Sequence, residues 1–84
     1  MKGQMGMSKA DEMFEKLGYK KFLVGFISPN MKELYGKADK RICFWLNKTI
    51  EVYDFYDGGE TITIQELQAI NEKVKELGWL DEYN

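Results

Sequence analysis

Residues 41–79 constrain this chain most, because they predict a hairpin, a glycine turn and a capped helix in direct succession. Apolar side chains alternate with others along two neighbouring segments, the period-two pattern of strands with one buried face. β-Branched and aromatic residues fill both segments, which suits a half-buried pleated surface. The sequence therefore predicts antiparallel strands over approximately 40–47 and 49–56, with a turn at Asn47-Lys48.

Two registers of this hairpin are open. A two-residue loop would pair Trp45 with Ile50, whereas a three-residue loop would pair Leu46 with Ile50 and Phe44 with Val52. We favour the three-residue loop because it places one apolar set on a single face, and a slip of one residue would move that set to the other side. This apolar face comprises Ile42, Phe44, Leu46, Ile50 and Val52.

A helix is predicted over approximately 63–77. Asp57-Gly58-Gly59 breaks the preceding strand, and Thr63 and Glu66 have the spacing of a capping box. Gly78 is a typical helix stop, after which Trp79 can fold back on the last turn. The expected core-facing stripe is Leu67, Ile70, Val74 and Leu77.

Similar signals predict a first helix over approximately 8–17. Ser8 with Asp11 resembles a capping box, and Gly18 ends the helix so that Tyr19 can pack back on Phe14. The expected stripe of this helix is Ala10, Met13, Phe14 and Leu17.

The segment between the first helix and the hairpin is less regular. Residues 20–28 are nearly continuous in apolar side chains and predict a first strand, in which Gly25 marks a bulge or a close backbone approach. In residues 30–40, the helical spacing of Met31, Leu34 and Tyr35 favours a short helical turn closed by Gly36. An irregular hairpin connection is the alternative.

Together these elements predict a single α+β domain over residues 8–80. Its order is helix, three antiparallel strands, helix, in two layers. Residues 1–7 are predicted to form a disordered leader and residues 81–84 a frayed acidic tail. Met1, Met5 and Met7 are all possible translation starts, and we favour Met7.

Composition excludes several classes of protein. A single domain of 84 residues buries a limited core, and one cysteine without histidine rules out an internal disulfide and the commonest zinc sites. No segment approaches the roughly 20 apolar residues of a membrane span. We therefore expect a protein of the cytoplasm that uses no cofactor or metal and does not bind membranes.

Charge is unevenly distributed along the chain. Residues 16–48 carry eight basic and two acidic side chains, whereas residues 49–84 carry two basic and nine acidic ones. In one interpretation the two halves attract each other or are simply solvated. In the other, the basic half forms a patch for an acidic partner. The candidate basic patch is Lys20, Lys21, Lys40, Arg41 and Lys48.

Catalysis is not expected. Asp54, Asp57 and Glu60 flank the glycine turn, but the two residues after Asp54 are aromatic and do not fit a calcium loop. Without histidine, no Ser/His or Cys/His nucleophile arrangement exists, and Cys43 in a strand is expected to be a buried, inert thiol.

A protein interface is the stronger expectation. Cys43, Trp45, Tyr53 and Phe55 alternate onto the face opposite the predicted apolar one. If both helices cover the other face, this aromatic face points outward and marks an interface. If the helices divide between the two faces, both faces are core.

Three segments of the chain resemble small, uncharacterised phage and prophage proteins of Gram-positive bacteria. They are MSKADEMFEKLGYKK at 7–21, ICFWLNKTIEVYDF at 42–55 and TITIQELQAINEKVKELGWL at 61–80; residues 23–40 depart from the pattern. The resemblance implies a phage or mobile-element origin, a bacterial cytoplasm and an accessory role. It supplies no catalytic residue or ligand.

Two functions are therefore expected. The first is a non-catalytic protein-interaction module that binds a host or phage protein and forms a homodimer. The alternative is a nucleic-acid-binding accessory protein that uses the basic segment 16–48.

Overall fold

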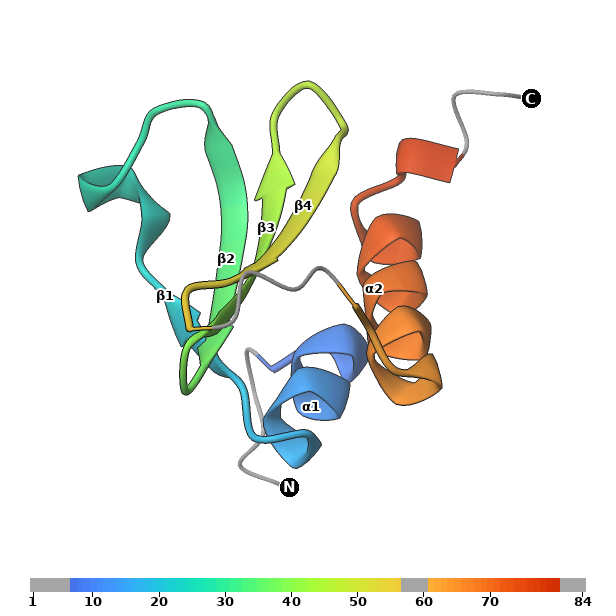
Figure 1. Cartoon of the computed structure of the whole chain (residues 1–84). Coiled ribbons are helices and arrows are strands. Elements are labelled where there is room, and N and C mark those ends of the chain that lie inside the picture. The colour runs from blue at the N-terminus through green and yellow to red at the C-terminus, as the bar shows by residue number, and fades with distance from the viewer. Residues whose placement is uncertain (1–6, 57–60, 81–84) are drawn as a thin grey trace.

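The computed structural model describes residues 7–56 and 61–80, which form a four-stranded antiparallel meander and two helices (Figure 1). The elements are α1 (Lys9–Lys16), β1 (Lys20–Phe22), the 3₁₀ turn η1 (Val24–Phe26), β2 (Met31–Lys37), β3 (Lys40–Trp45), β4 (Ile50–Asp54) and α2 (Ile64–Glu76). The α+β class is confirmed. The predicted leader before Met7, the turn at Asp57-Gly58-Gly59 with Glu60, and the tail 81–84 lie outside the described residues.

The prediction of three strands was wrong, because the segment expected to be a helical turn forms β2. This strand lies inside the sheet, paired with β1 on one side and β3 on the other. Leu34 and Tyr35 are both buried, on opposite faces of the sheet. Pairing on two sides and burial on two faces outweigh the weak helical spacing of these residues.

The first strand is shorter than predicted. β1 ends at Phe22 and the chain then turns through η1, where Leu23 and Ile27 are exposed to solvent. Gly25 lies in this turn, and a Cβ atom added to it would have no other atom within 4 Å. It therefore marks neither a bulge nor a close backbone approach. The irregularity of the sheet is in β2 instead, between Met31 and Glu33.

The β3–β4 hairpin adopts neither predicted register. Phe44 lies opposite Ile50, and the turn is closed by hydrogen bonds from Trp45 N–H to Thr49 O (2.9 Å) and from Lys48 N–H to Trp45 O (2.9 Å). Lys48 takes the left-handed conformation, at φ 71°, that glycine often supplies in such turns. The register is two residues from the preferred one, so the apolar residues that pair still share a face, and only Leu46 moves out into the turn.

Both helices pack on one face of the sheet (Figure 1). Phe14 of α1 stacks on Tyr35 with ring centroids 4.1 Å apart and meets Phe44 edge-on. The buried core cluster consists of Phe14, Tyr19, Tyr35, Ile42, Phe44, Ala69 and Ile70. The face of α2 that meets the core differs from the predicted stripe, since Leu67 is exposed.

No helix within residues 7–56 and 61–80 is long and apolar enough to cross a membrane.

The predicted helix ends are confirmed. Ser8 Oγ accepts the N–H of Asp11, and the Thr63–Glu66 capping box is complete in both directions. Gly18 has φ 96°, and Tyr19 N–H donates to Phe14 O at 3.0 Å while the two rings meet edge-on. These contacts depend on residues three to five positions apart, which is why local sequence predicts them.

Replacing the cap residue of α2 should measurably weaken the domain. Thr63→Ala removes the acceptor of the Glu66 N–H and is expected to cost about 1 kcal/mol, or about 4–8 °C in melting temperature. Thr61→Ala, at an exposed position nearby, is the matched control and should change stability by less than about 0.5 kcal/mol. Equal thermal melts of the two variants would contradict the role of the cap.

Candidate functional site

The side of the sheet away from both helices, which we call the outer face, carries the four predicted interface residues. The register places Arg41, Cys43 and Trp45 on the outer face of β3, and Tyr53 and then Phe55 beside them on the β4 segment. The alternative in which the helices divide between the two faces is therefore wrong. The outer face also includes Arg41, which the sequence had suggested only as part of a basic patch.

Arg41 is held between two aromatic rings. Its guanidinium carbon lies 5.2 Å from the ring centroid of Phe22 and 5.4 Å from that of Phe55. Its Nη1 donates to the carbonyl oxygens of Ala38 and Lys40, each at 2.9 Å. These bonds and ring contacts orient the side chain before any partner arrives, and each cation–π contact contributes about 0.5–1 kcal/mol at an exposed site.

Gly36 makes room for this arrangement. A Cβ atom at position 36 would lie 3.0 Å from both Phe22 Cζ and Arg41 Nη1. Phe22 and Gly36 belong to the site only through the pairing of β1, β2 and β3, so sequence reasoning missed them.

The outer face is most exposed at the end of β4. Phe55 is 65% exposed, and its ring meets the half-buried ring of Tyr53 edge-on at 5.1 Å. At the other end, Trp45 Nε1 donates to Glu51 Oε1 at 3.1 Å, and a hollow of about 440 Å³ opens beside the indole. The residues that line this hollow are Asn30, Trp45, Leu46 and Asn47.

Cys43 differs from the other predicted interface residues, because it lies beneath the surface. Its exposed fraction is 0%. Burial, with a smaller contribution from the Glu51 carboxylate, raises the pKa of the thiol to about 11. The expectation of a buried thiol is confirmed, and the side chain offers no contact area to a partner.

The candidate basic patch is not one surface. Lys20 and Arg41 belong to the outer face, but Lys21 and Lys40 lie on the helix side, and Lys48 is in the β3–β4 turn. Lys21 is paired with Asp11 at 3.2 Å and Glu33 at 3.1 Å, and Lys40 with Glu66 at 2.8 Å. The Lys40 pair joins the basic half of the chain to the acidic half, as the interpretation of mutual attraction expected.

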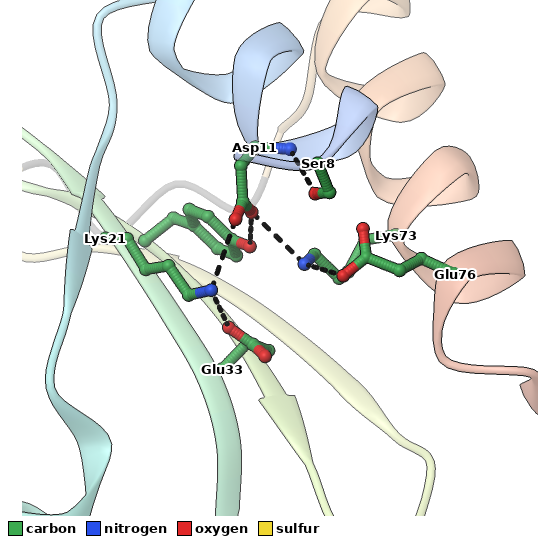
Figure 2. A network of polar contacts seen from close by, with 7 residues as sticks. Ser8, Asp11, Lys21, Glu33, Lys73 and Glu76 are labelled. Carbon is green, nitrogen blue, oxygen red and sulfur yellow. Dashed lines mark hydrogen bonds and ion pairs between the residues drawn. The ribbon is translucent and has the colours of Figure 1, made fainter. Parts of the chain in front are cut away.

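An ionic network around the buried Lys73 lies on the helix side (Figure 2). Lys73 of α2 is 0% exposed, and its Nζ lies 3.1 Å from Asp11 Oδ1 and 2.8 Å from Glu76 Oε2. Tyr35 donates its hydroxyl to Asp11. Burial alone would raise the pKa of Asp11, but hydrogen bonds from Tyr35, Lys73 and Lys21 outweigh it and hold this pKa below its ordinary value.

Glu66 forms the centre of a second network. Its carboxylate accepts from Tyr19 Oη and Lys40 Nζ, both at 2.8 Å, and from the Thr63 backbone. Burial opposes the charged form of Glu66, yet these donors keep its pKa below the ordinary value. Burial and the neighbouring carboxylate raise the pKa of Tyr19. The capping box therefore also ties α2 to β3 and to the end of α1.

A cleft of about 500 Å³ lies between α1 and β1, and Asp11, Lys21 and Tyr35 line part of it. Lys21 and Tyr35 each bond to Asp11 across the cleft, so these groups stabilise the fold. In residues 7–56 and 61–80, no three His, Cys, Asp or Glu side chains are grouped so as to hold a metal ion. Two members of the predicted acidic cluster, Asp57 and Glu60, fall outside that range.

Comparisons with protein-family models, curated proteins and solved structures found no significant match. The resemblance to small phage and prophage proteins therefore stays a prediction.

The ionic network was missed because the predicted core-facing stripe of α2 did not include Lys73. One signal was available: Glu66, Ala69, Ile70 and Lys73 have helical spacing, and they are the buried residues of α2. The predicted stripe shares only Ile70 with this set and contains no charged residue.

Removing the buried ammonium should cost far more than removing an exposed one. Lys73→Met removes the cation that Asp11 and Glu76 share, but Asp11 keeps Lys21 and Tyr35 as partners and Glu76 is exposed. We therefore expect a loss of about 1–3 kcal/mol in unfolding free energy at neutral pH. The matched control on the same helix, Lys75→Met, should change little, since Lys75 is exposed. Urea unfolding followed by circular dichroism measures both.

Acidification should shrink the Lys73→Met effect. The pKa values of Asp11 and Glu76 are lowered in the folded state, so their stabilisation is complete above the ordinary values of 3.8 and 4.5. It is lost as the pH falls below those values and through the lowered folded ones. A cost that did not change on acidification would show that Lys73 acts by packing alone.

The buried thiol should be unreactive in the native protein. We expect Cys43 to be labelled by a chromogenic disulfide reagent only after denaturant unfolds the domain, because the group is buried and its pKa is about 11. Rapid labelling of the native protein would contradict the burial of this strand position.

Proposed function

We propose that this protein is a non-catalytic protein-interaction module, an accessory protein of phage or prophage origin that acts in the bacterial cytoplasm. Its partner is a host or phage protein that docks on the outer face. One observation carries the proposal: Phe55 stands 65% exposed against an ordered Arg41, on the sheet face opposite both helices.

The chemistry of this face suits a protein partner. Aromatic side chains and arginine are enriched where binding energy concentrates in protein interfaces. Arg41 is already oriented by two carbonyl oxygens and two rings, so binding would cost it little side-chain entropy. The hollow beside Trp45 offers a recess for an apolar anchor of the partner.

Affinity capture tests this proposal with two equally exposed apolar residues. Immobilised wild-type protein should retain a specific partner from host or phage-infected cells, and Phe55→Ala should reduce retention at least tenfold, which corresponds to about 1.4 kcal/mol. Ile64→Ala is the control, because Ile64 is 66% exposed but begins α2 on another surface. Docking on the outer face would be contradicted if both variants lost retention of the partner equally, or if neither lost any.

Nucleic-acid binding is the second candidate. Arg41 with Phe22 and Phe55, and Lys20 at the edge of the same face, are groups on which bases can stack and phosphates can pair. Against it, Lys21 and Lys40 are already paired with carboxylates. Retention of a mixed oligonucleotide pool that falls steeply with salt and is lost in Arg41→Ala would favour this function over the first.

A further inference from the structure

The outer edge of β4 carries hydrogen-bonding groups directed away from the sheet. Trp45 N–H donates to Thr49 O, and Phe55 N–H donates to Asp39 O, which fixes the odd-numbered residues of β4 as the ones bonded to β3. Bonding alternates along an antiparallel strand, so the backbone groups of Ile50 and Val52 point outward. Within the described part of the chain, no backbone bond reaches these groups.

The two edges of the sheet differ in protection. β1 is only three residues long, carries Lys20 and Lys21, and turns away into η1. These are devices by which natural proteins protect an edge strand. β4 has five residues, no lysine or proline within it, and no bulge in its pairing with β3. An edge of this kind is a template for another strand.

We propose that β4 pairs with β4 of a second copy of this chain, antiparallel and about a two-fold axis, to form a continuous eight-stranded sheet. The second copy is the occupant because the strand is complementary to itself. Two copies centred on Val52 pair all five residues of β4, and the outward N–H and C=O of each Val52 bond those of the other. This dimer does not depend on the proposed partner binding, and it leaves both outer faces open and side by side.

Charge selects the register. If Val52 lies opposite its own copy, each Glu51 carboxylate lies opposite a Tyr53, whose hydroxyl can donate to it, and the apolar Val52 side chains meet at the axis. Two neighbouring registers also match outward groups, but each pairs only three of the five β4 residues. One places Glu51 opposite Glu51, and the other places Tyr53 opposite Tyr53. Like charges directly opposite are destabilising, so the Val52-centred register is favoured.

A proline tests the edge without removing a bond of the monomer. Ile50→Pro deletes an N–H that points outward, and proline is tolerated at such edge positions. Ile50→Val is the matched control, since it shortens the side chain but keeps the N–H. By light scattering, wild type and Ile50→Val should have twice the chain mass of 9.9 kDa, and Ile50→Pro should have the monomer mass with an unchanged circular dichroism spectrum.

Three outcomes of this experiment would overturn the proposal, the last two of which concern a dimer that does form. One is a wild-type protein that stays monomeric up to a concentration of about 1 mM, the range of a very weak complex. The second is a dimer that survives in folded Ile50→Pro, and the third is one that is abolished by Phe55→Ala, since loss in Phe55→Ala would place the contact on the outer face.

Cysteine crosslinking tests the register, and it needs no proline variant. In the proposed register, residue 51 of one copy lies directly opposite residue 53 of the other. The two form a non-hydrogen-bonded pair, whose Cα atoms are about 4.5 Å apart, and a disulfide can span that distance. Mixing Glu51→Cys chains with Tyr53→Cys chains under oxidation should give covalent dimers, each made of one Glu51→Cys chain and one Tyr53→Cys chain. Both variants are made with Cys43→Ala as well, because Cys43 lies directly opposite residue 51 on β3 and could form an intrachain disulfide with it. Either variant alone should then give few covalent dimers. Equal crosslinking of each variant alone would overturn the proposed register.

Discussion

The buried ion pair between Asp11 and Lys73 is the contact on which the rest of the arrangement depends. It joins α1 to α2, and Tyr35 brings the inner strand β2 to the same carboxylate. Lys73 is fully buried, and its charge is tolerated there because the Asp11 and Glu76 carboxylates lie beside it. The pair therefore fixes which side of α2 faces the core: Lys73 turns inward and Leu67 turns out.

This position of the helices determines what the sheet presents to solvent. Because α1 and α2 contact each other and share one face, the opposite face retains its aromatic side chains at the surface. Arg41 is ordered there by neighbours from three strand segments and a turn, whereas Cys43 is covered. The same meander leaves β4 at an edge with outward backbone groups. Partner binding and strand pairing thus use different parts of the molecule.

Sequence reasoning succeeded where the determinants are close in the chain. Ser8, Thr63 and Gly18 begin or end helices as predicted, because the groups they cap or release lie within five residues. It failed where the determinants are distant. The spacing in 30–40 favoured a helical turn, yet strands on both sides made that segment a strand. The hairpin register differs by two residues from the predicted one because the turn places Lys48 in the left-handed conformation. No glycine at that position indicated this in the sequence.

The sequence alone determined the helix termini, the α+β class and the side-chain alternation that separates the two faces of the β3–β4 hairpin. Each follows from local hydrogen bonding or from the two-residue period of a strand. Only the tertiary structure decided that both helices cover one face, that Lys73 pairs with Asp11, and that Phe22 and Gly36 accommodate Arg41. Lys73 and Asp11 are 62 positions apart and Phe22 and Arg41 are 19 apart, and the energy of such contacts depends on burial that no short segment possesses by itself.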